Sequence, residues 1–317
     1  MFLQIFLLLL GFVLLVKGAD VFVDSAVGIA KKLNIPGFII GLTIVAMGTS
    51  IPEVVVNITA SAQGSGQLAL GNVVGSNIFN LLICIGVCAF FHPLTTRVRE
   101  FSRDFWLSVG ITCLILAVVL FSDNIPRIVA ALLTIGFVVY TVLIVISALK
   151  NRKSSEDVQE SDESDTKSRS LGLNIFLVIL GAGLIFAGGH LTVDNAISLA
   201  FAIGISERVV GLTIVAIGTS LPELVTCLVA CKKGQTHIAI GNVIGSNVLN
   251  LMLVLGISGM VAPIPVDLNI AFDMVMLLIA SGAFFIFAYT GKRVVRYEGL
   301  TLFLMYTAYM SFLVFAT

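Results

Sequence analysis

Two short stretches of the sequence carry the same oxygen-bearing side chains at the same spacing. One reads Gly-Thr-Ser-Ile-Pro-Glu and ends at Glu53, and the other reads Gly-Thr-Ser-Leu-Pro-Glu and ends at Glu223. A threonine lies four residues before each glutamate, so on a helix the hydroxyl and the carboxylate share one face. The proline before each glutamate has no N–H, which leaves the carbonyl four residues earlier without its helical partner. Each stretch therefore predicts a broken helix that presents a carboxylate, a hydroxyl and a free carbonyl together.

A second motif, Gly-Asn-Val-x-Gly-Ser-Asn, follows each glutamate motif. Its serine shares a helix face with an asparagine four residues later, although such residues also serve helix packing and interhelical hydrogen bonding. Together the motifs supply only oxygen ligands, which suit hard cations such as Ca²⁺ and Na⁺ better than softer metals. Two carboxylates balance one divalent or two monovalent cations, so one ion load can replace the other. The candidate residues of the second motif are Ser76, Asn80, Ser246 and Asn250.

The composition places these motifs in a membrane. Of the 317 residues, 58% are hydrophobic and 11% are charged, and the mean hydropathy is +1.09. So few charges cannot cover a soluble globule, and so much apolar mass excludes disorder for the bulk of the chain. The net charge of zero disfavours nucleic acid as a partner. Apolar runs long enough to cross a bilayer as helices occur at 2–24, 36–62, 67–91, 104–122, 126–149, 172–196, 206–231, 236–261, 270–290 and 297–315.

Both glutamates fall in the middle of predicted spans. A carboxylate at that depth costs at least a few kcal/mol unless it meets a partner or a water-filled cavity. No Lys or Arg lies near Glu53 or Glu223 in these spans to neutralise them. The missing partner is a bound cation, and a purely structural role for the pair is the alternative.

The two halves of the sequence form an inverted repeat. Shifted by 170 positions, they align without a gap from about residue 11 to residue 93. Each half holds five predicted spans, so the second half must enter the membrane from the opposite side. The loop charges agree, because Lys31 and Lys32 follow the first span while Phe201 and Ala202 occupy the matching places after the sixth. Most basic residues follow odd-numbered spans, which predicts that those loops are cytoplasmic and both termini lie outside.

This arrangement divides the chain into a five-helix repeat at 1–149, a cytoplasmic linker at 150–170 and a second, inverted repeat at 171–317. The linker is polar and carries six acids between Glu156 and Asp165, which indicates a solvated tether or, alternatively, a regulatory segment. Spans four, five, nine and ten carry almost no internal polar groups and are expected to be scaffold. The predicted fold is an all-α membrane protein in which helices two, three, seven and eight are broken around a central ion site, as in secondary transporters.

The doubled motifs closely resemble the α-repeats of sodium/calcium exchangers, in the cation/calcium antiporter superfamily, over all ten predicted spans. The resemblance implies exchange of Na⁺ for Ca²⁺ by alternating access, with spans one and six sliding as a gating pair over the other eight. It implies that Ca²⁺ binds Glu53, Glu223, Thr49 and Thr219, and that two asparagines complete the centre. Besides the glutamates, the implied Na⁺ ligands are Ser50, Ser76, Ser220, Ser246 and the carbonyls of Ala46 and Ala216, and the asparagines are Asn80 and Asn250.

Several alternatives stay open at this point. Some relatives, including potassium-dependent ones, carry Asp where this chain has Asn250, so the resemblance implies a potassium-independent exchanger. Two close carboxylates could also bind protons, which would make the protein a Ca²⁺/H⁺ exchanger, although proton-coupled branches usually show Gly-Asn-x-x-Glu. A cation channel fits the inverted repeat less well. A membrane enzyme is least favoured, and we expect no cofactor and a functional monomer in the cell membrane.

Two further groups of residues have competing interpretations. Asp20 and Asp24 lie near the cytoplasmic end of the first span, where Lys17 could pair with Asp20 at a spacing of three residues. Structural pairing is the simpler interpretation for these aspartates, and a role in ion access or gating is the alternative. The five cysteines all fall within predicted spans without accompanying His or acidic residues at metal-ligand spacing, and we interpret them as small apolar filler.

Overall fold

The computed structural model describes residues 2–150, 169–203, 216–266 and 268–316, which are almost entirely helical. Within these ranges, seven helices are long and apolar enough to cross a membrane. They are α1 (Phe2–Leu33), α5 to α6 (Gly66–Phe91), α7 (Val98–Phe121), α8 (Arg127–Lys150), α9 (Leu171–Ala202), α13 to α14 (Thr236–Val261) and most of α15 (Leu268–Thr290). These helices match seven of the ten predicted spans.

The remaining predicted spans are accounted for less uniformly. The second predicted span is a bent pair of helical segments, Gly37–Thr49 and Ile51–Ala62, which meet at 47° and form an eighth candidate crossing. The seventh begins among residues 204–215, outside the described part, and continues as α11 (Ala216–Thr219) and α12 (Leu221–Lys232). The tenth coincides with helix α16 (Arg296–Ala316). The acidic part of the linker also lies outside the described residues, so its structure is not tested.

Two helices in the middle of the molecule are the most buried spans. One comprises α5 (Gly66–Phe79), the π-helical segment η2 (Asn80–Cys84) and α6 (Ile85–Phe91), and the other comprises α13 (Thr236–Leu249), η6 (Asn250–Val254) and α14 (Leu255–Val261). The third and eighth predicted spans are therefore continuous helices. In place of the predicted break, each contains a π-helical segment that begins at the predicted asparagine. Such segments often occur at functional sites because they alter the direction of nearby side chains.

The first bent crossing packs closely against α13. It comprises α2 (Gly37–Ile40), the π-helical segment η1 (Gly41–Val45), α3 (Ala46–Thr49) and α4 (Ile51–Ala62). A Cβ atom added at Gly245 would lie 2.8 Å from the Cβ of Ala46, so only glycine permits this approach. The glycine of the second motif thus brings the two crossings together beside the predicted site.

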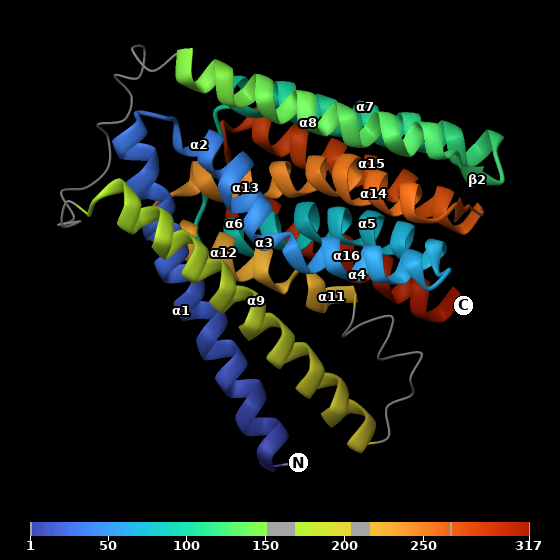
Figure 1. Ribbon diagram of the computed structural model, residues 1–317, viewed down its shortest axis with the longest axis horizontal. Coiled ribbons are helices and arrows are strands. Elements are labelled where there is room, and N and C mark those ends of the chain that lie inside the picture. The colour runs from blue at the N-terminus through green and yellow to red at the C-terminus, as the bar shows by residue number, and fades with distance from the viewer. Residues whose placement is uncertain (1, 151–168, 204–215, 267, 317) are drawn as a thin grey trace.

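Helices α1 and α9 form an antiparallel pair on one side of the molecule (Figure 1). Their contact depends on small residues, because a Cβ added at Gly188 would lie 2.6 Å from the backbone nitrogen of Leu15 and 2.7 Å from the carbonyl oxygen of Gly11. Much of each helix is exposed and apolar. The pair therefore packs mainly through one glycine-rich seam and leaves its outer face for lipid.

Two short antiparallel strand pairs join the halves. Strand β1 (Leu94–Thr95) pairs with β4 (Arg293–Val294), and β2 (Asn124–Ile125) pairs with β3 (Ile264–Pro265). The first pair joins loops after spans three and nine, and the second joins loops after spans four and eight. Odd-numbered loops thus meet odd-numbered loops and even meet even, as the predicted inversion requires.

The scaffold helices contain more polar chemistry than predicted. The Tyr140 hydroxyl donates to the Asp104 carboxylate at 2.9 Å between α7 and α8, and the Tyr309 hydroxyl lies 2.8 Å from the Asp273 carboxylate between α15 and α16. Each tyrosine follows its aspartate by 36 residues. The repeat therefore extends into the outer helices. A sequence comparison does not reveal it there, because the residues around each pair are mostly apolar.

Candidate cation-binding site

Each glutamate lies in the first turn after a helix break. Helix α3 ends at Thr49 and α4 begins at Ile51, and Ser50 between them has φ −87° and ψ 11°. Ser220 occupies the same place between α11 and α12, with φ −92° and ψ 4°. The prolines sit at the second position of the new helices, where a missing N–H costs no helical hydrogen bond. The predicted breaks are confirmed, and each one falls on the serine two residues before the proline.

The two halves exchange hydrogen bonds at the carboxylates. The Ser50 hydroxyl donates to Oε1 of Glu223 at 2.8 Å, and the Ser220 hydroxyl donates to Oε1 of Glu53 at 3.4 Å. Ser246 joins this group, since its Oγ lies 3.0 Å from Ser50 Oγ and 3.5 Å from Glu223 Oε1. Both carboxylates are fully buried, with exposed fractions of 1% and 0%. Each repeat therefore completes the site of the other.

Four oxygens of this group have no hydrogen-bond partner although they are completely buried. They belong to two carboxylates, one hydroxyl and one amide, and each would cost free energy comparable to a lost hydrogen bond if left unpaired. Their clustering in the two repeated motifs fits the oxygen set that a hard cation requires. The unpartnered atoms are Glu53 Oε2, Glu223 Oε2, Ser76 Oγ and Asn250 Oδ1.

The threonines of the motif face the neighbouring repeat. Thr49 donates its hydroxyl to Oδ1 of Asn242 at 3.1 Å, and Thr219 donates to Oδ1 of Asn72 at 3.3 Å. The Ala46 carbonyl accepts the N–H of Ser50 at 3.0 Å and also lies 3.3 Å from the Thr49 hydroxyl, so it already has two neighbouring donors. The surroundings of Ala216 lie outside the described part of the chain.

Asparagines form a second reciprocal layer beside the carboxylates. Asn80 donates to Oδ1 of Asn247 and Asn250 donates to Oδ1 of Asn77, both at 3.1 Å. Asn77 and Asn247 also donate to each other's backbone carbonyls, at 3.2 and 3.3 Å. The partners Asn72, Asn242, Asn77 and Asn247 were not among the predicted site residues. They recur within the doubled motif, which marks them as repeated but does not distinguish them from packing residues.

The ligand types at the site are restricted. Among the described residues, no group of three or more His, Cys, Asp or Glu side chains is placed to hold a metal ion. The two carboxylates must therefore be supplemented by hydroxyl, amide and carbonyl oxygens. Four of the five cysteines are buried and all are free, while Cys113 is exposed on α7. The interpretation of most cysteines as packing residues is consistent with this, although Asn242 also donates to Cys227 Sγ at 3.3 Å.

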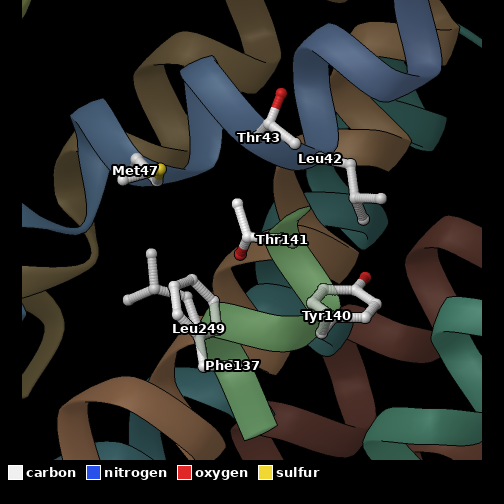
Figure 2. Close-up of a pocket in the computed structure, with 8 residues that line it drawn as sticks. Leu42, Thr43, Met47, Phe137, Tyr140, Thr141 and Leu249 are labelled. Carbon is white, nitrogen blue, oxygen red and sulfur yellow. The ribbon is translucent and has the colours of Figure 1, made fainter. Parts of the chain in front are cut away.

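A small pocket lies between η1, α3, α8 and α13 (Figure 2). Its lining is mostly apolar, with Thr43, Tyr140 and Thr141 as the hydroxyl-bearing residues, and Met47 at its edge is exposed. None of the twelve predicted site residues lines it.

Helices α1 and α9 lie directly against the breaks. A Cβ added at Gly48 would lie 2.6 Å from the ring of Phe22 on α1, and Gly218 is in the same way close to Val193 on α9. Gly48 and Gly218 belong to the glutamate motifs, so their lack of a side chain lets the two long helices cover the site. This position fits the predicted pairing of spans one and six.

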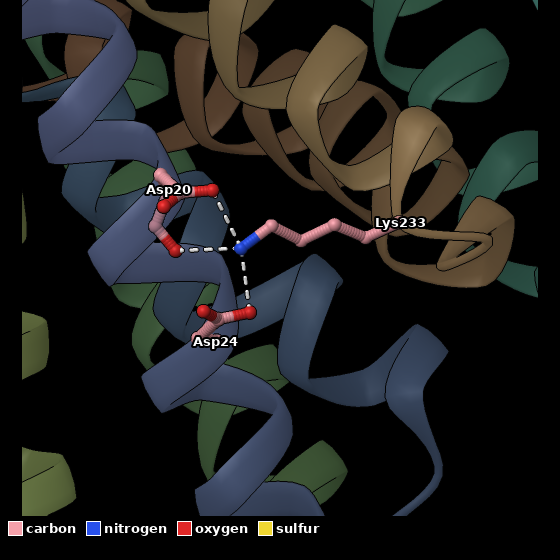
Figure 3. A network of polar contacts seen from close by, with 3 residues as sticks. All are labelled: Asp20, Asp24 and Lys233. Carbon is pink, nitrogen blue, oxygen red and sulfur yellow. Dashed lines mark hydrogen bonds and ion pairs between the residues drawn. The ribbon is translucent and has the colours of Figure 1, made fainter. Parts of the chain in front are cut away.

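The two aspartates of α1 form ion pairs with one lysine at the end of α12 (Figure 3). The ammonium of Lys233, at the end of α12, lies 2.7 Å from Asp20 Oδ1 and 2.6 Å from Asp24 Oδ1. The suggested pairing of Asp20 with Lys17 is therefore wrong. A local spacing rule could not anticipate a partner more than 200 positions away, which only the fold brings near.

The fold and the site define a class, namely a multi-pass membrane protein in which two inverted repeats enclose a buried cluster of carboxylate, hydroxyl and amide oxygens. The chain belongs to the family described as "Sodium/calcium exchanger protein", whose profile matches residues 3–146 and 173–315. It is 38% identical to the putative antiporter CaxA of Alkalimonas amylolytica, over 96% of this chain and 97% of that protein. It is 35% identical to the sodium/calcium exchanger MaX1 of Methanosarcina acetivorans, over 96% of each.

A solved structure shows the same architecture. The sodium-calcium exchanger NCX_Mj, soaked with Na⁺ and Ca²⁺, aligns with a TM-score of 0.83 and 28% sequence identity over 98% of both chains. The all-helical, inverted-repeat fold predicted from the sequence is confirmed by this likeness.

Proposed function

We propose that the protein is a secondary antiporter that exchanges Na⁺ for Ca²⁺ across the membrane by alternating access. One observation carries the proposal, namely that both glutamates keep a completely buried carboxylate oxygen without a hydrogen-bond partner among the described residues, and that the nearby motif residue Ser76 and, three residues past its motif, Asn250 each keep such an oxygen as well. The two carboxylates have no basic partner, so their charge calls for cations. One Ca²⁺ or two Na⁺ ions would each neutralise the pair, and the buried site would exchange one load for the other without leaving bare charge.

We assign ion binding to twelve residues in and beside the doubled motifs. Ca²⁺ would be held by Glu53 and Glu223 with Thr49 and Thr219. Na⁺ would use the same glutamates together with serines and two alanine carbonyls, and the site would contain the two asparagines. The serines, carbonyls and asparagines are Ser50, Ser76, Ser220, Ser246, Ala46, Ala216, Asn80 and Asn250. The paired contacts of Ser50 and Ser220 with the opposite glutamates support this assignment.

The proposed orientation follows from charge. Lys31, Lys32 and Lys233 lie at the ends of α1 and α12, and basic residues concentrate on the cytoplasmic side. We assign this end of the molecule, with the linker at 150–170, to the cytoplasm, and both termini to the outside of the cell membrane. The carrier would act as a monomer, need no potassium and use no cofactor, with the bilayer as its surroundings.

The decisive experiment is ion flux into vesicles that contain the purified protein. A Na⁺ gradient alone should drive Ca²⁺ uptake, while a proton gradient alone should not. Uptake driven only by protons would replace the proposal with Ca²⁺/H⁺ exchange. Ca²⁺ movement that needs no counter-gradient would instead indicate a channel.

A further inference from the structure

The two long helices α1 and α9 do not cover the core equally. Helix α1 packs along α12, whereas α9 packs on α3, α11 and α12 rather than on α4, the repeat partner of α12, among the described residues. The exposed fractions follow this difference. Val55 on α4 is 49% exposed, whereas its repeat counterpart Val225 on α12 is 9% exposed. We call the part of the molecule around α12 the α12 half and the part around α4 the α4 half. The α12 half is covered by a long helix, and the α4 half is left exposed.

A three-residue ion cluster lies where α1 crosses the end of α12. The Lys233 ammonium is within 2.7 Å of both aspartate carboxylates and also donates to the backbone carbonyl of Asp20 at 3.1 Å. Its side chain is only 25% exposed. Asp20 and Asp24 are four residues apart on one face of α1, so a single lysine can meet both. The contact joins the covering helix to the core.

The inverted repeat has no copy of this cluster in the other half. The position that matches Lys233 is Gln63, which has no charge, and Asp20 is matched by His190. In the described structure, His190 lies 3.7 Å from Asp194 on its own helix, and both side chains are largely exposed. Since the glutamate and serine motifs of the buried site recur in both halves and the residues of this contact do not, the contact distinguishes the two ends of the molecule energetically.

We propose that Lys233 is a latch on α1 that holds the α12 half closed and so favours the conformer in which the α4 half is accessible. The latch makes the resting carrier load more readily from the side of the α4 end. For rearrangement, the two carboxylates of α1 must leave the ammonium as α1 moves along α12. Lys233 is a positioning residue, because it touches neither the proposed ligands nor the ions.

The latch rests on the proposed exchange function, and the first test measures it in oriented vesicles. Replacing Lys233 by Met removes the charge and keeps an unbranched side chain of similar length. We expect K233M to lower the KM for Ca²⁺ on the Lys233 side by about three- to tenfold, because the fraction of carrier open to that side rises. The KM on the opposite side should not fall. Equal changes on both sides, or no change, would overturn the latch.

Three matched variants separate the latch from general damage. Lys232 lies beside Lys233 and makes none of the ion pairs found in the described part of the chain, so K232M should leave both KM values unchanged despite the same loss of charge. K233R should behave as the wild type. The exchange of charges in the double variant Asp24→Lys with Lys233→Asp should restore the wild-type ratio of the two KM values, which a merely packed lysine would not allow.

A second readout does not depend on transport. A cysteine at position 225, in place of the covered Val225, is exposed to a membrane-impermeant maleimide from the Lys233 side, and labelling at this residue is measured by mass spectrometry. K233M should accelerate the labelling several-fold, and an unchanged rate would overturn the latch. Faster labelling in a protein that moves no Ca²⁺ would retain the latch and reject the proposed function.

Discussion

At the scale of single residues, the site depends on contacts that each half makes with the other. Glu53 and Glu223 receive hydroxyls from the opposite repeat, and each keeps one oxygen unpaired in a fully buried position. A buried carboxylate without a basic partner has a large desolvation cost, which a bound cation offsets. The unpaired oxygen of each carboxylate is therefore the atom on which the proposed ion binding depends most directly.

Neutralising either glutamate should abolish exchange. Glu53→Gln or Glu223→Gln keeps the size and one oxygen but removes the charge that balances Ca²⁺. We expect Na⁺-driven Ca²⁺ uptake in vesicles to fall to background for both variants. Glu100→Gln, which alters a partly exposed ion pair with Arg97 and His237, should retain uptake. Full activity of either site variant would refute the assignment.

The asparagine layer should contribute to stability as well as to the site. Asn247→Ala removes the acceptor of Asn80 and the donor to the Asn77 carbonyl, and buried unpaired groups cost about 1–3 kcal/mol each. We expect a loss of about 2 kcal/mol or more, seen as a lower Tm in detergent. Asn57→Ala is the control, because Asn57 donates only to the carbonyl of Glu53 on its own helix. Equal melting temperatures for the two variants would contradict the role of the layer.

The doubled motif and the cost of a buried carboxylate point to the glutamates and the hydroxyl and amide residues near them. The carbonyls of Ala46 and Ala216, and the division into Ca²⁺ and Na⁺ ligands, rest instead on the resemblance to sodium/calcium exchangers. Asn72, Asn77 and their counterparts could not be separated from packing residues in this way. An asparagine on a small-residue helix serves equally well in either role, and only its partner across the interface decides between them. Lys233 was missed for the same reason, since its partners come from a distant helix.

At the scale of elements, two kinds of irregularity position the site. Crossings two and seven are interrupted at a serine, where proline starts the next helix without losing a hydrogen bond. The central helices contain a π-helical segment that begins at Asn80 or Asn250, and crossing two contains another at Gly41–Val45. Proline and glycine made the first irregularity predictable. The second has no comparable residue signal, because a π-helical segment follows from packing rather than from a single breaker.

The seam between α1 and α9 should be sensitive to one methyl group. Gly188→Ala would bring a Cβ within 2.7 Å of two backbone atoms of α1, so the helices must separate or shift. We expect a clear loss of exchange rate with the buried site otherwise intact. Gly183→Ala on the same helix is the control, because a Cβ there meets no atom within 4 Å, and it should transport normally. Wild-type rates for Gly188→Ala would show that this contact is not needed for movement.

At the scale of the whole molecule, the strand pairs and the ion pairs sort the loops into two sides. Odd-numbered loops pair through β1 and β4, and even-numbered loops pair through β2 and β3. The salt bridge between Glu100 and His237 also joins ends that follow odd-numbered spans. The sequence repeat and the loop charges could predict this sorting, whereas the strand pairs could not be foreseen from segments of two residues.

The predicted orientation can be measured with two single cysteines. Thr95 lies exposed after span three and Gln63 lies exposed after span two, so they should face opposite sides. In a chain with Cys113 replaced by Ala, an impermeant maleimide added to intact cells should label Gln63→Cys. It should label Thr95→Cys only after the cells are opened. The reverse pattern would invert the orientation, and labelling of both in intact cells would refute the assignment of loops to two sides.

The reciprocal hydrogen bonds have a consequence for how such a carrier can be assembled. Each glutamate accepts a hydrogen bond from the serine of the opposite repeat, and under the proposed assignment neither repeat holds the complete set of ligands. The covalent link between the repeats is then not required for the site, and the two repeats act as the two subunits of a heterodimer within one chain. Two polypeptides cut between Lys150 and Ser170 should find each other in the bilayer and regain the ion site, while either fragment inserted alone should bind neither ion.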